Sequence, residues 1–128
     1  MSVVLVGAGC STAGPNHLYT IGGVQSGTIT DHAEAGIETM AIPSYLEADD
    51  TLLGLAYDPY TDHLFLRLSP GHQFRVVDRP DRSIKREFVA PDIPATGGGD
   101  LAIRSRDRHL FLSHPTNPSL IEITLYGK

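Results

Sequence analysis

Residues 54–66 read GLAYDPYTDHLFL, and 46 residues later the chain reads DLAIRSRDRHLFL over residues 100–112. The same step backwards from His63 reaches HLYT at residues 17–20. Self-similarity at a fixed spacing is typical of proteins built from one structural unit used several times. The sequence therefore predicts three copies of one small unit.

Each copy has the composition of short β-strands separated by turns. The second copy is the clearest, because Pro, Gly and Asp interrupt segments rich in large apolar and β-branched residues. We expect its four strands at residues 52–57, 63–68, 73–78 and 83–89. A period of 46 or 47 residues lies at the edge of the range for β-propeller blades, which are four-stranded antiparallel sheets. The predicted fold class is therefore all-β, with three propeller blades per chain.

The 128 residues suit a single domain of blade repeats. We expect blade 1 at residues 1–46, blade 2 at 47–92 and blade 3 at 93–128. The first copy is expected to begin with a strand at Val3–Val6 and to align His17 with His63 and Asp31 with Asp78. The third copy stops at the turn before a fourth strand, so this interpretation gives eleven strands and an incomplete last blade.

Three blades cannot curve round to meet, since propellers typically have four to eight. A second copy of the chain would complete a six-bladed ring with two-fold symmetry, so we expect a homodimer. Two alternatives stay open, namely a fragment of a longer propeller and a flat stack of repeats capped in another way. Residues 1–16 form either the inner strand of blade 1 or the outer strand of a partner's last blade.

The composition argues against several classes of protein, namely nucleic-acid-binding, membrane-spanning and secreted proteins. A net charge of −5 and a pI near 5.6 argue against general binding of nucleic acid, which needs a basic surface. The sequence has no run of 18 apolar residues and no basic residue before its short apolar start, so we expect neither a membrane span nor a secretory signal. A single cysteine, Cys10, fits a reducing compartment, and the expected location is the cytoplasm.

Several segments resemble blades of the NHL and YVTN types of β-propeller. The resemblance rests on GLAYDP at 54–59, HLFL at 63–66, FRVVDR at 74–79, IKREF at 84–88 and LIEITLYGK at 120–128. It covers residues 52–128 and implies a blade fold. It does not imply one activity, because these families include protein-binding and RNA-binding modules, lactone hydrolases and an antibiotic lyase. No set of catalytic residues of those enzymes carries over to this chain.

In propellers of this kind, ligands usually meet the face formed by the loops before the first strand and between the second and third strands. Histidine with carboxylates can bind a divalent cation or transfer protons near neutral pH, whereas the plainer interpretation is a set of solvated turn residues. Gly97–Gly99 either let a ligand approach bare backbone or form a flexible turn. The candidate ligand-binding residues on this face are His72, His114, Asp49, Asp50, Asp100, Asn117 and Gly98.

Three repeated histidines, His17, His63 and His109, are expected on the opposite face. They form either a ring of functional side chains or a set of polar corner residues that bond to the neighbouring turn. Repeated positions in repeat proteins usually serve the repeat, which favours the corner interpretation.

The sequence contains no GxSxG motif and no recognisable catalytic triad, and Cys10 has no identifiable partner. We therefore expect a non-catalytic binding module that holds a small molecule, glycan or peptide at its loop face or channel, without a cofactor. The alternative is a metal-dependent hydrolase or lyase of the lactonase-like propeller type, which would hold a divalent cation at the channel mouth.

Overall fold

The computed structural model describes residues 19–21, 28–33, 36–41, 46–47, 49–94 and 100–128. These residues form three antiparallel sheets and no helix, so the described part contains no helix that could cross a membrane. The fold is all-β, as predicted. The predicted strand at Val3–Val6 and the candidate residue Gly98 lie outside the described residues.

The middle sheet contains four strands in the order β4-β5-β6-β7, each antiparallel to the next. The predicted strand boundaries of the second copy are confirmed to within one residue. The turns between strands have the expected chemistry, with Asp62 and Arg82 in the left-handed backbone region at φ of 58° and 62°. The strands are β4 (Leu52–Asp58), β5 (His63–Leu68), β6 (Gln73–Asp78) and β7 (Ile84–Val89).

The first and third sheets each contain three described strands. The first sheet has the order β1-β2-β3, and the third has the order β10-β9-β8. Arg108 repeats the left-handed conformation of Asp62, 46 residues earlier, with a φ of 61°. The repeat thus extends to the backbone of the turn. The strands are β1 (Tyr19–Ile21), β2 (Thr28–Ala33), β3 (Gly36–Ala41), β8 (Leu101–Arg104), β9 (His109–Ser113) and β10 (Leu120–Ile123).

Strand pairing in the first sheet corrects the sequence alignment of the first copy. The middle sheet pairs His63 with Asp78, so the alignment places His17 opposite Asp31. The structure instead pairs Tyr19 with Asp31. The partner of Asp31 is thus displaced by two residues, which keeps the same face of the strand because side chains alternate with a period of two. Tyr19 therefore takes the pairing position that the sequence assigned to His17.

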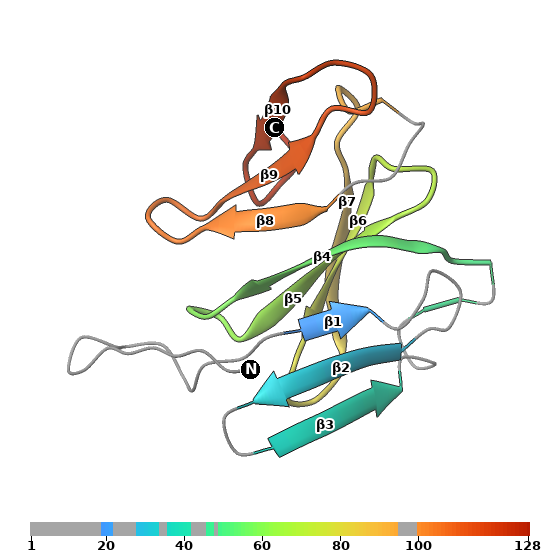
Figure 1. Ribbon diagram of the computed structural model, residues 1–128, viewed down its shortest axis with the longest axis vertical. Helices are drawn as coiled ribbons and strands as arrows, with labels where there is room; N and C mark the ends of the chain where they lie inside the picture. Colours follow the sequence, from blue (N-terminus) through green and yellow to red (C-terminus); the bar gives the residue numbers. More distant parts are fainter. Residues whose placement is uncertain (1–18, 22–27, 34–35, 42–45, 48, 95–99) are drawn as a thin grey trace.

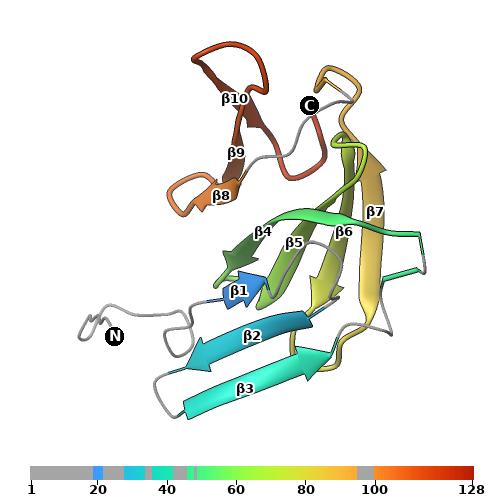
Figure 2. The ribbon, with the colours of Figure 1, turned by 45° about the vertical axis from the view of Figure 1, so that its right-hand side comes forward.

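The three sheets follow one another in space as they do in sequence, from the first sheet to the third (Figures 1 and 2). The middle sheet is covered on both faces. Its Leu64, Leu66 and Val77 pack with Ile29 of the first sheet. Its opposite face packs against the third sheet in a second apolar cluster of ten buried residues, namely Ala56, Phe65, Phe74, Val76, Ala90, Ile93, Leu101, Leu110, Leu112 and Ile123.

The repeat also determines which face of each sheet points to its neighbour. Leu64 and Leu66 face the preceding sheet, and Leu110 and Leu112, 46 residues later, do the same. On the other face, Phe65 is buried by the third sheet, whereas the equivalent Phe111 is only partly buried. Near it on this face, at the start of β10, Leu120 is 71% exposed. In the described part of the chain no other sheet covers this face, although the Arg104 guanidinium of the same sheet lies 4.6 Å from the ring centre of Phe111.

The C-terminal turn at residues 124–128 packs against β7 of the middle sheet. The Arg86 guanidinium lies 5.1 Å from the ring centre of Phe88 and 4.6 Å from that of Tyr126. Gly127 adopts a φ of +84°, and a Cβ at this position would lie 2.9 Å from a ring carbon of Phe88. Glycine is therefore required both by the backbone angle and by the close contact.

Candidate functional site

Four groups of connecting residues lie together at one end of the sheets, in the upper and right-hand part of Figure 1. We call this the loop end. It comprises the described residues before β4, the turn 69–72 between β5 and β6, the described residues 90–94 and 100 between β7 and β8, and the turn 114–119 between β9 and β10. The Ser69 amide donates to the Thr51 carbonyl at 2.8 Å, and the Ala90 amide donates to the His72 carbonyl at 2.9 Å. These bonds join the first three groups into one surface.

The loop end contains the candidate residues that the structure describes, but it does not gather them into one cluster. Asp49 is exposed in the turn before β4, and Asp100 is exposed directly before β8. Asn117 is exposed in the turn between β9 and β10. They therefore lie on three different connections.

Asp50 has a structural role. Its carboxylate accepts a hydrogen bond from the Glu47 amide at 2.7 Å and forms an ion pair with Arg75 at 2.6 Å. Arg75 is buried in β6 and also pairs with Glu87 of β7. Burial alone would lower the pKa of Arg75, but the hydrogen bonds to Asp50 and Glu87 outweigh it and raise that pKa. Asp50 thus compensates a buried cation rather than facing a ligand.

His114 stabilises its own turn. Its Nδ1 accepts hydrogen bonds from the backbone amides of Thr116 and Asn117, each at 3.1 Å. Because Nδ1 acts as an acceptor, the neutral ring carries its proton on Nε2. The local geometry fits the turn-residue interpretation of His114.

The remaining candidate, His72, lines a pocket of about 510 Å³ at the loop end. The pocket is shallow and open to solvent, and its lining is more apolar than polar, with Ile93 buried and Val89 53% exposed. Two residues with polar side chains, His72 and Asp92, also line the pocket. The His72 Nδ1 is buried and makes no hydrogen bond within the described part of the chain. The lining residues are His72, Val89, Pro91, Asp92, Ile93 and Pro94.

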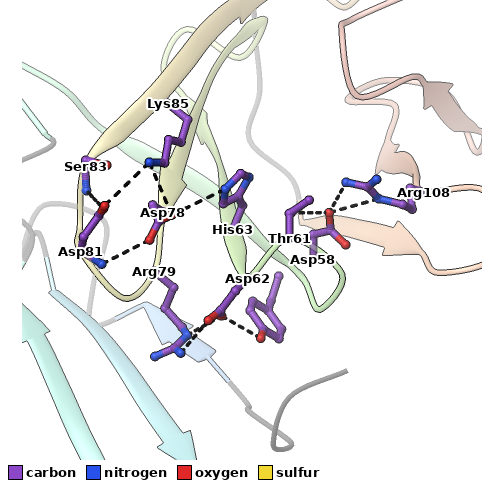
Figure 3. Close-up of polar contacts among 11 residues, drawn as sticks. Asp58, Thr61, Asp62, His63, Asp78, Arg79, Asp81, Ser83, Lys85 and Arg108 are labelled. Atoms are coloured by element: carbon purple, nitrogen blue, oxygen red, sulfur yellow. Dashed lines mark hydrogen bonds and ion pairs between the residues drawn. The ribbon is translucent and has the colours of Figure 1, made fainter. Parts of the chain in front are cut away.

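The opposite end of the sheets consists of turns connected by ion pairs (Figure 3). Arg79 binds the Asp62 carboxylate with two hydrogen bonds of 2.6 and 2.8 Å, and the Tyr57 hydroxyl donates to the same carboxylate at 2.9 Å. Burial and the neighbouring Asp62 raise the pKa of Tyr57 to about 12. This group links the turn after β4 to the turn after β6.

A second group links the middle sheet to the third sheet. Asp58 is fully buried, and its carboxylate accepts hydrogen bonds from the Tyr60 amide at 3.1 Å and the Thr61 hydroxyl at 2.7 Å. Arg108, from the turn between β8 and β9, adds an ion pair to this carboxylate (Figure 3). The buried charge is thus paired and hydrogen-bonded, as a buried charge must be.

The repeated histidines occupy equivalent positions in the middle and third sheets. His63 lies 3.8 Å from the Asp78 carboxylate, and the His109 Nδ1 lies 2.6 Å from a Glu122 carboxylate oxygen. Each histidine of the second strand thus faces an acidic side chain of the third strand. This pairing supports the interpretation of His63 and His109 as polar corner residues, while His17 lies outside the described residues.

Asp107, His109 and Glu122 bring three potential metal ligands within 4.8 Å of one another, a grouping that the sequence did not reveal. Arg104 already binds both carboxylates, at 2.8 Å to Asp107 and 2.6 Å to Glu122. Its hydrogen bond and charge hold the pKa of Asp107 well below the usual range. A fixed cation thus supplies the charge that a metal would provide, and the group acts as an ion-pair network.

Solved structures include folds similar to this chain. A Bacteroides thetaiotaomicron VPI-5482 protein of unknown function matches 88% of the chain with a TM-score of 0.64 and 16% identity. Saccharomyces cerevisiae Sqt1 matches 76% of the chain with a TM-score of 0.42 and 11% identity. The chain spans 29% of the length of the first protein and 27% of the second. The first likeness shows that this arrangement of antiparallel sheets also occurs within a larger protein.

No family model matches the sequence, and the search of curated proteins also found no match. The resemblance to NHL and YVTN blades is therefore not confirmed by these comparisons.

Asp92 and the two prolines of the pocket were not among the predicted site residues. The sequence PDIP at 91–94 reads as an ordinary connection, and only the folded chain brings it against His72. One signal was present in the sequence, since Asp92 lies in a connection without any Lys or Arg.

Proposed function

We propose that this chain is a non-catalytic binding module whose ligand, a small molecule or peptide, occupies the pocket beside His72. The observation that carries this proposal is the chemistry of the pocket. A mostly apolar lining with a few polar side chains is typical of ligand sites, and a volume of about 510 Å³ suits a side chain or small ligand.

The bonding of the described histidines favours binding over catalysis. Nucleophilic catalysis needs a base hydrogen-bonded to a Ser, Cys or similar nucleophile. In the described part of the chain, His63 and His109 face carboxylates, and His114 accepts from backbone amides. His32 bonds the Thr20 hydroxyl, which is exposed on the first sheet and far from the pocket in sequence. These contacts support a structural role for each of them.

Binding of a small uncharged ligand tests whether the pocket is a binding site. Titration of isotope-labelled protein with N-acetyl-leucinamide should shift the resonances of His72, Val89 and Ile93. The substitution Val89→Arg, at an exposed wall position, should abolish these shifts, whereas Ile84→Arg at the other end of β7 should not. Unchanged resonances at these three residues with wild-type protein would overturn the proposed site.

For the assembly, we propose that residues 1–46, 47–92 and 93–128 are three propeller blades, and that a second copy closes a six-bladed ring. The uncovered face of the third sheet supports this. Ala102 and Phe111 are equivalent, by the 46-residue repeat, to Ala56 and Phe65. In the middle sheet these two residues are buried against the next sheet. The same face also carries Arg104, His109 and Glu122, so it combines exposed apolar side chains with an ion-pair network. Exposed apolar side chains on an uncovered sheet face are consistent with an interface.

Light scattering coupled to gel filtration tests the ring. We expect a mass of twice 13.8 kDa for the wild type. Ala102→Arg should give a folded monomer, because it places a charge on the uncovered face. Ser105→Arg adds the same charge in an exposed turn and should leave the mass unchanged. A folded wild-type monomer would refute the ring.

A further inference from the structure

Acidic and basic residues are unevenly distributed between the loop end and the opposite end of the sheets. The described residues of the loop end, at 46–47, 49–51, 69–72, 90–94, 100 and 114–119, include five acidic residues and none of the ten Lys and Arg residues. The rest of the sequence has ten acidic and ten basic residues, so the formal net charge of −5 equals the number of acidic residues at the loop end. The five acidic residues are Glu47, Asp49, Asp50, Asp92 and Asp100.

Four of these carboxylates are available to a partner. Asp50 is held by Arg75, as described above. Glu47, Asp49, Asp92 and Asp100 are exposed, and within the described residues their side chains form no ion pair. At the opposite end, by contrast, Asp58, Asp62, Asp81 and Asp107 all pair with basic side chains. Among these acidic residues, those without a described ion pair therefore lie at the loop end.

This acidic surface adjoins the apolar pocket. Asp92 lines the pocket itself, and the backbone bonds from Ser69 to Thr51 and from Ala90 to His72 connect the pocket to the turn that carries Glu47 and Asp49. We call the exposed carboxylates Glu47, Asp49 and Asp92 the acidic rim. A ligand that contacts both the pocket and the rim must be longer than one side chain.

We propose that the pocket and acidic rim bind a basic segment of a partner protein, with an aliphatic side chain in the pocket and flanking Lys or Arg side chains against the rim. This inference rests on the proposed binding function and adds the chemistry of its ligand. Charge complementarity determines the choice, because the rim attracts cations and repels nucleic acid and anionic lipid. A free metal ion fits less well, because no three potential ligands of the described loop end converge.

Fluorescence anisotropy with two labelled peptides tests the proposal. One peptide has a leucine between two lysines, with glycines at both ends; the other replaces the lysines by glutamates. We expect the lysine peptide to bind and the glutamate peptide not to bind. Binding should weaken as the salt concentration rises, because the rim is exposed to solvent.

Two charge variants locate the site. Asp92→Asn should weaken binding of the lysine peptide by about threefold, the effect of one exposed ion pair. Asp81→Asn makes the same charge change in an exposed turn at the opposite end and should have no effect. An equal effect of both variants would overturn the proposed location.

The remaining outcomes separate this inference from the proposed function. If both peptides bind equally, or neither binds while N-acetyl-leucinamide still shifts the pocket resonances, the basic-segment inference is wrong and the binding function stands. If EDTA abolishes peptide binding, a metal ion forms the bridge and the inference is also wrong. If the neutral probe fails as well, the proposed function itself is refuted.

Discussion

The ion pair between Arg108 and Asp58 links the middle and third sheets. Removing the Arg108 side chain should lower the free energy of unfolding substantially. Asp58 is fully buried in the middle sheet, and Arg108 reaches it from the third. Arg108→Ala would leave the carboxylate buried with only the Tyr60 amide and the Thr61 hydroxyl as partners. The variant keeps a Cβ, so the cost of the left-handed backbone at residue 108 stays the same.

The size of the effect follows from the burial of the two partners. Breaking a fully buried ion pair costs about 3–5 kcal/mol, and leaving a buried acceptor short of a partner costs about 1–3 kcal/mol. Arg108 is about one-third exposed, so water can replace part of its contribution. We therefore expect Arg108→Ala to lower the free energy of unfolding by about 2 kcal/mol.

Urea unfolding followed by circular dichroism measures this change, since the chain has no tryptophan. Arg106→Ala is the matched control, because Arg106 lies in the same turn with its side chain 77% exposed. We expect the control to cost less than about 0.5 kcal/mol, as surface substitutions usually do. In a double-mutant cycle with Asp58→Ala, the coupling energy should exceed about 1 kcal/mol. Equal effects of the two arginine variants, or a coupling energy near zero, would refute the reasoning.

Three further substitutions test other contacts. Gly127→Ala should lower the free energy of unfolding by about 1–2 kcal/mol, through the left-handed backbone and the contact with Phe88, and urea unfolding would contradict this if the midpoint stayed unchanged. The raised pKa of Tyr57 favours the neutral phenol in the folded state, so stability present below pH 10 is lost as the pH rises towards 12. Tyr57→Phe should flatten this alkaline decline in the urea midpoint, and an unaltered decline would exclude Tyr57 as its source. The hydrogen bond from His109, with help from Arg104, lowers the pKa of Glu122, so its stabilisation is present above the unfolded pKa and is lost as the pH falls. Glu122→Gln should therefore reduce the acid sensitivity of the urea midpoint between pH 6 and pH 3, and equal acid sensitivity of variant and wild type would disprove this role.

The strands could be predicted from residue 52 onwards because each is marked locally. In the second copy, apolar segments such as HLFL at 63–66 end at turns containing Pro, Gly or Asp, so the boundaries follow from short-range chemistry. The first copy lacks such marks, and its register depends on a turn length that a repeat alignment does not show. Tyr19 therefore occupies the pairing position that was expected for His17.

The candidate site was predictable only in part. His72 could be assigned to the loop end from the order of the strands, but the pocket also needs residues 89–94, which fold back against it. Asp50 and His114 have residue types suited to ligand binding, yet local bonds engage both. Such bonds depend on turn geometry and on a partner far along the chain, and composition does not reveal either.

The covering of the middle sheet on both faces has a consequence for how the chain opens. In arrays of repeated units, stability is shared between each unit and its immediate neighbours, so units with one neighbour open more readily than units with two. The amides of β5 and β6, inside the middle sheet, should therefore exchange their hydrogens most slowly. In a single chain, exchange should begin at the two outer sheets and reach the centre last. Closure of the proposed ring would give each outer sheet a second neighbour and should reduce this difference.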